Sequence, residues 1–200
     1  MQFLLGLSRL VDRFNDFVGS SLRWLVLGAV LISAGNAIVR KVFNLSSNAL
    51  LEIQWYLFAA VFMLGAGYAF LRNVHVRIDF ISSKLTKRTN AIIDAAGIVI
   101  FLIPLCLILI KLSWPFFYNA LVTGEMSSNA GGLIRWPVLA LIPLGFAILL
   151  AQALSELVKR IAYLRGVIAE PLSVEAGKSD EEILAEELAL EAERKLAGVK

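Results

Sequence analysis

Residues 91–112 read AIIDAAGIVIFLIPLCLILIKL, and this stretch decides the fold class. No charged side chain lies between Asp94 and Lys111. An α-helix needs about 20 apolar residues to cross the hydrocarbon core of a bilayer. The stretch is therefore predicted to span a membrane. A kink is expected at Pro104, because proline cannot donate a backbone hydrogen bond to the carbonyl of Ile100.

Three more runs of this kind occupy residues 22–39, 49–71 and 137–158. Apolar residues make up 58% of the 200-residue chain, whereas a soluble domain contains about 45–50%. In lipid, backbone polar groups must be paired within the protein, and a helix pairs them within one segment. The four runs therefore predict an all-α integral membrane protein with four transmembrane helices.

The two ends of the chain differ from these runs. Residues 1–20 place apolar side chains every three or four positions among charged ones, which predicts an amphipathic helix. We expect this helix to lie flat in the membrane interface, and a soluble helix packed on a neighbour is the alternative. Residues 166–200 form an acidic C-terminal helix or tail, which leaves residues 21–165 as the transmembrane domain.

Basic residues are distributed unevenly about the four runs. Four spans place both termini and the 72–90 loop on one side of the membrane, and 15 of the 19 lysines and arginines lie on that side. The positive-inside rule assigns it to the cytoplasm. Because the basic residues flank apolar runs and form no single patch, nucleic acid is not an expected partner.

Few residues could support chemistry within the spans. Cys106 is the only cysteine and His75 the only histidine, which excludes an intrachain disulfide and a four-cysteine metal site. The charged residues of the runs are expected near span ends: Glu52, Asp94, Lys111 and Glu156. An ion or proton pathway would need polar groups deep in several spans. The chain is therefore expected to have no transport pathway of its own.

Two other classes of function stay open at this stage. A membrane anchor of a redox complex would need haem or quinone ligands within the spans. An integral-membrane enzyme would need a polar cluster near one interface, for which Arg72, His75 and Asp79 are the candidates.

Two features of the second run are candidate contacts. Glu52 is interpreted either as an ion ligand or partner-docking group, or as a carboxylate favoured by the positive end of the helix dipole. Gly65 and Ala69 form a pair of small residues four positions apart, which lets another helix approach closely.

The second run and the loop after it, EIQWYLFAAVFMLGAGYAFLRNVHVRIDF (residues 52–80), carry a family resemblance. An acidic residue opens the run, small residues follow, and the segment ends in Arg–x–x–His–Val–Arg–x–Asp. Gly124-Glu125, Ser127-Ser128, Trp136-Pro137 and Pro143-Leu144-Gly145 follow in order. Over residues 15–165 the chain resembles the DctQ-like small membrane subunit of tripartite ATP-independent periplasmic (TRAP) transporters.

The resemblance implies a scaffold role without enzymatic activity. It implies a large membrane subunit that holds the substrate and sodium sites, and a periplasmic substrate-binding protein that delivers an organic acid. It also implies a multi-pass protein of a bacterial or archaeal cytoplasmic membrane, with no cofactor in this chain. The residues expected to contact partners or lipids are Glu52, Gly65, Ala69, Arg72, His75, Arg77, Asp79, Glu125, Ser127, Arg135 and Trp136.

Overall fold

A computed structural model describes residues 1–44, 47–73 and 85–168 of the chain. Four helices in these residues are long and apolar enough to cross a membrane, which confirms the prediction of an all-helical chain with four spans. The first two helices are α1 (Gln2–Phe43) and α2 (Asn48–Leu71). The third is continuous and consists of α4 (Lys87–Gly97), the wide π-turn η1 (Ile98–Leu102) and α5 (Ile103–Thr123). The fourth is α6 (Trp136–Leu164).

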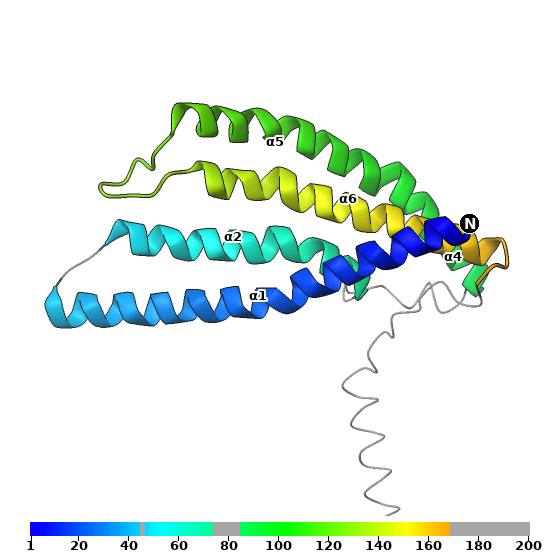
Figure 1. Cartoon of the computed structure of the whole chain (residues 1–200), viewed down its shortest axis with the longest axis horizontal. Coiled ribbons are helices and arrows are strands. Elements are labelled where there is room, and N and C mark those ends of the chain that lie inside the picture. Colours follow the sequence, from blue (N-terminus) through cyan, green and yellow to red (C-terminus); the bar gives the residue numbers. More distant parts are fainter. Residues whose placement is uncertain (45–46, 74–84, 169–200) are drawn as a thin grey trace, which may run out of the picture.

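The four helices run side by side, with α6 between α2 and α5 and with α1 on the far side of α2 (Figure 1). The N-terminal part of α1 crosses over to reach α6 (Figure 1). We call the end that carries the 124–135 connection the loop end. We call the opposite end, where residue 1 and residue 165 lie, the terminal end.

The prediction of a separate interfacial helix at residues 1–20 is wrong. These residues belong to the 42-residue helix α1, and the domain boundary drawn after residue 20 falls inside it. Their polar side chains pack against α6, while Phe3 and Phe17 are 82% and 72% exposed on the outside. The helix continues because residues 2–43 contain no proline and because its polar side chains find partners on α6.

The third span is longer than expected. The helix continues past Leu112 to Thr123 and ends where Gly124 adopts a left-handed conformation, at φ 63°. Pro104 is the second residue after the π-turn, and this wider turn accommodates the missing hydrogen bond without ending the helix. Lys111 therefore lies twelve residues before the end of α5, farther from the helix end than the expected two turns.

Small residues let the helices pack closely at the centre of the bundle. A Cβ atom added to Gly145 of α6 would lie 2.6 Å from the main-chain oxygen of Met63 in α2. A Cβ atom on Gly65 would lie 3.0 Å from Leu22 of α1. Membrane helices associate through such close contacts, because lipid provides little hydrophobic driving force between them.

Candidate functional site

The loop between α5 and α6 is folded into an ordered hairpin. Glu125 accepts a main-chain hydrogen bond from Arg135 at 2.9 Å, and Ser127 donates one to Leu133 at 2.9 Å. Gly131 turns the tip with φ 70°, a left-handed conformation that favours glycine. These bonds hold the two sides of residues 125–135 in register across the loop end of the bundle.

Glu52 fastens this loop to the second helix. Its carboxylate is 4% exposed, and it accepts hydrogen bonds from the Ser127 hydroxyl, from Asn129 Nδ2 at 2.8 Å and from the Leu133 main-chain N–H at 2.6 Å. Buried carboxylates are stable when they receive several such bonds. The Glu52 side chain is thus occupied by the chain's own loop.

Two further side chains of α2 bind the same loop. Asn48 Nδ2 donates to the carbonyl of Ala130 at 2.9 Å, and the Tyr56 hydroxyl donates to the carbonyl of Ile134 at 3.0 Å. Gly132 fits between these contacts, since an added Cβ atom would lie 2.8 Å from the Glu52 carboxylate. The first three turns of α2 therefore position the loop.

The outer surface of the loop carries an exposed ion pair between Glu125 and Arg135. The two side chains are 36% and 47% exposed, and they border an open hollow formed with Phe116 and Leu139. Trp136 is 37% exposed at the start of α6. Charge and apolar surface are thus available together beside the loop.

A second polar centre lies at the terminal end, between α1 and α6. Asn15 and Gln152 are fully buried and joined by a 2.9 Å hydrogen bond. Gln152 also donates to Asp12 at 2.9 Å, and Ser155 donates to the same carboxylate at 3.0 Å. Polar side chains of the N-terminal segment thereby find partners on α6, while Asn15 Oδ1 is buried without a hydrogen-bond partner.

Buried charges extend this network to α4. Lys159 lies 3.0 Å from Asp12 and 2.5 Å from Glu156, and Arg160 lies 2.5 Å from Glu156 and 3.2 Å from Asp94. Every charge of this group therefore has an opposite charge beside it, as buried charges require. The network joins α1, α4 and α6.

Sequence reasoning did not anticipate this terminal network, although a signal exists. The polar residues of α6 recur at helical spacing, and so do those of the N-terminal segment: Gln152, Ser155, Glu156 and Lys159, and Ser8, Asp12 and Asn15. Two polar stripes of this kind in a membrane protein can bury each other.

The comparison with known families identifies the chain. The model of the DctQ component of tripartite ATP-independent periplasmic transporters matches residues 22–162. The chain belongs to this DctQ family. No curated protein and no solved structure matches the chain.

Family membership confirms the sequence-based recognition. The DctQ chain is the small membrane component of a TRAP transporter, a multi-pass membrane protein and not an enzyme. The two alternatives, a redox anchor and a membrane enzyme, are set aside by this result.

The predicted contact residues of the DctQ chain are distributed over several places. At the loop end, Glu52 is bonded to Ser127, and Arg135 is paired with Glu125. Trp136 begins α6 next to Arg135. Gly65 faces Leu22 of the chain's own α1, and Ala69 is half-buried one turn further along α2. Three predicted residues lie outside the described residues: His75, Arg77 and Asp79.

Arg72 is the first residue after α2, at the terminal end of the bundle. It forms an ion pair with Asp16 of α1, and its guanidinium lies 5.5 Å from the centre of the Tyr68 ring. The hydrogen bond to Asp16 raises the pKa of Arg72 above its ordinary value, because it favours the charged form. Arg72 thus joins α2 to α1 in the DctQ chain.

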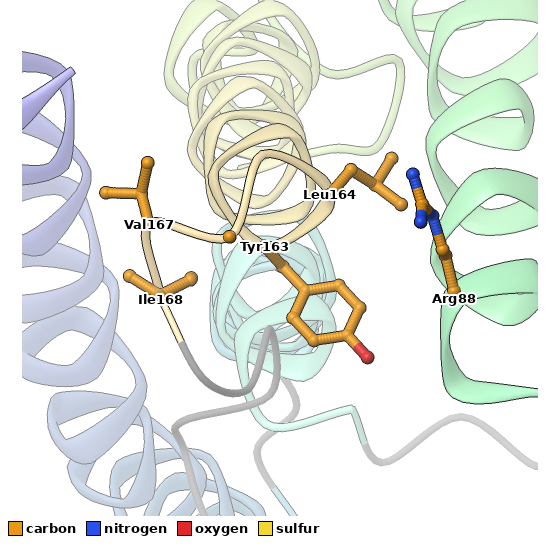
Figure 2. Close-up of a pocket in the computed structure, with 6 residues that line it drawn as sticks. Arg88, Tyr163, Leu164, Val167 and Ile168 are labelled. Atoms are coloured by element: carbon orange, nitrogen blue, oxygen red, sulfur yellow. The ribbon is translucent and has the colours of Figure 1, made fainter.

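One further hollow lies at the terminal end of the DctQ chain, between the start of α4 and the end of α6. Figure 2 shows Tyr163 and Leu164 pointing toward Arg88, with Val167 and Ile168 on the far side of the turn. Among the described residues, no three His, Cys, Asp or Glu side chains gather to hold a metal ion. The hollow offers one cation and apolar walls, which is no catalytic arrangement.

Proposed function

We propose that this DctQ subunit braces the large membrane subunit of a TRAP transporter during sodium-coupled uptake of an organic acid. The sodium and substrate sites belong to the large subunit in this proposal, and a periplasmic binding protein delivers the substrate. The termini lie in the cytoplasm, in agreement with the excess of basic residues at the terminal end. The loop end then faces the periplasm.

The observation that supports a bracing role is the closed centre of the bundle. Between the two polar centres, α2 and α6 are in direct contact at Met63 and Gly145. At the loop end and the terminal end, buried carboxylates are paired with partners of the same chain. A closely packed bundle whose buried carboxylates are paired within the chain suits a support better than a conducting element.

Reconstitution tests the bracing proposal. Proteoliposomes are prepared with the large subunit and the binding protein, with and without the DctQ chain, and sodium-driven uptake is measured. We expect uptake only with all three components. Uptake at the full rate without the DctQ chain, or uptake by the DctQ chain alone, would contradict the proposal.

The loop with the Glu125–Arg135 pair is proposed to contact the binding protein. Glu125→Arg and Arg135→Glu are made singly and together, and uptake is measured at limiting binding protein. Because surface charges guide encounter, we expect the double variant to remain slow although its ion pair is restored. Recovery of the rate in the double variant would show that the pair only stabilises the loop.

A further inference from the structure

Lys111 is a charged residue in the apolar part of α5. It lies on the exposed side of α5, and it has no ion pair or hydrogen bond with any of the described residues. Every neighbour one turn away on that face is apolar and exposed: Leu107, Ile108, Trp114 and Pro115. A lone lysine therefore interrupts an otherwise apolar surface.

The position of Lys111 along the helix makes this exposure unfavourable. Twelve residues separate it from Thr123, which corresponds to about 18 Å of helix. The main-chain bond between Arg135 and Glu125 places the end of α5 level with the start of α6. From there to Arg160 the helix α6 covers about 36 Å, only slightly more than a hydrocarbon core of about 30 Å.

Snorkelling does not remove the difficulty. A lysine side chain that extends toward the nearer interface reaches about one helical turn, and two more turns of α5 lie beyond it. Ionisable residues at such depth usually face another protein element and pair with it. The cost of leaving Lys111 in lipid is removed if a carboxylate of another subunit meets it.

The packing of α5 shows why another subunit can reach this face. α5 lies at the edge of the bundle and packs mainly against α6. The side that it buries consists of small residues, Cys106, Ser113 and Ala120. Its opposite side, with Lys111 near the middle, meets no other helix of the chain among the described residues.

We infer that the outward face of α5 around Lys111 is the contact with the large membrane subunit, and that Lys111 pairs there with a carboxylate of that subunit. The inference rests on the proposed function. It specifies which face of this chain meets the large subunit, and it requires a negative charge on the large subunit at that place. It predicts a transmembrane segment of the large subunit with an Asp or Glu at matching depth.

The test uses the large subunit, tagged and co-expressed with the full DctQ chain in membranes. The amount of DctQ chain recovered per large subunit is measured for Lys111→Met, Lys111→Arg and Lys41→Met. We expect recovery to fall about 3- to 30-fold for Lys111→Met, the range for one polar contact between membrane helices. Lys111→Arg should retain it. Lys41→Met is the matched control at the exposed end of α1 and should also retain it.

The thermal stability of the isolated chain separates assembly from folding. Lys111→Met should leave the unfolding midpoint unchanged or raise it, since a methionine suits lipid better than a lysine. Unchanged recovery of the Lys111→Met variant would overturn the inference, because the lysine would then only face lipid.

Photo-cross-linking then locates the contact face. A benzoyl-phenylalanine at Ile108 should cross-link to the large subunit, and one at Trp24 on the outward side of α1 should not. Cross-links from Trp24 but not from Ile108 would overturn the assignment of the face and leave the bracing role standing. Failure of the wild-type chain to co-purify with the large subunit would overturn the bracing role itself.

Discussion

The two ends of the bundle both bury a carboxylate, but they surround it differently. At the loop end, Glu52 accepts hydrogen bonds from three neutral donors of one loop. At the terminal end, Glu156 lies against the two cations Lys159 and Arg160. The first arrangement fixes a segment of chain, whereas the second holds whole helices together.

This difference decides what happens when each carboxylate is lost. Neutral donors of a surface loop can turn to water, because the loop can move away from α2. Buried cations cannot do so, since Lys159 and Arg160 are packed on α6 against α1 and α4. Loss of Glu156 should therefore affect the stability of the whole chain, and loss of Glu52 should affect the loop.

The largest effect is expected for Glu156→Ala. Removing one partner of a buried ion pair costs about 3–5 kcal/mol, and Glu156 serves two cations. The unfolding midpoint of the isolated subunit in detergent should fall accordingly. A midpoint within the error of the wild type would show that Asp12 and Asp94 alone satisfy both cations, and the comparison of the two ends would fail.

Glu52→Ala should act locally. The Leu133 amide loses its acceptor, and we expect its hydrogen exchange to accelerate roughly tenfold or more, as for loss of a charge-assisted bond. Exchange of amides in the terminal half of α6 serves as the control and should not change. Acceleration in both regions would mean that Glu52 supports the whole bundle.

Asn48→Ala should have a smaller effect of the same kind. The loop loses one neutral hydrogen bond, that to the Ala130 carbonyl, while Glu52 and Tyr56 keep theirs. Exchange of the loop amides should rise only a few-fold, since one such bond contributes about 0.5–1.5 kcal/mol. An effect as large as that of Glu52→Ala would show that the Glu52 carboxylate holds the loop no more strongly than a single neutral hydrogen bond does.

The smallest effect on stability is expected where the ion pairs are exposed. Asp16→Asn at the terminal end and Glu125→Gln at the loop end each break a pair whose side chains are about one third to one half exposed. Such pairs contribute about 0–1 kcal/mol. We expect unfolding midpoints close to the wild type for both variants. A large drop in the midpoint of either variant would show that its ion pair stabilises the fold as a buried pair does.

The sequence by itself determined the parts of this protein that depend on local hydropathy. The four spans, their order and the DctQ recognition follow from apolar runs and short motifs, because a bilayer selects helices by their own composition. The loop residues Glu125, Ser127 and Arg135 could be selected in the same way, from their place between two spans.

Only the tertiary structure decided how distant segments pair. From the sequence, the N-terminal segment is predicted to be an interfacial helix, because nothing in the sequence shows what its polar stripe would contact. In the structure, this stripe forms hydrogen bonds with α6. Glu52 and its loop are about 80 residues apart in the sequence. The continuation of α5 for twelve residues beyond Lys111, to Thr123, is likewise seen only in the structure. Pairing of this kind depends on the register between packed helices, which no local pattern encodes.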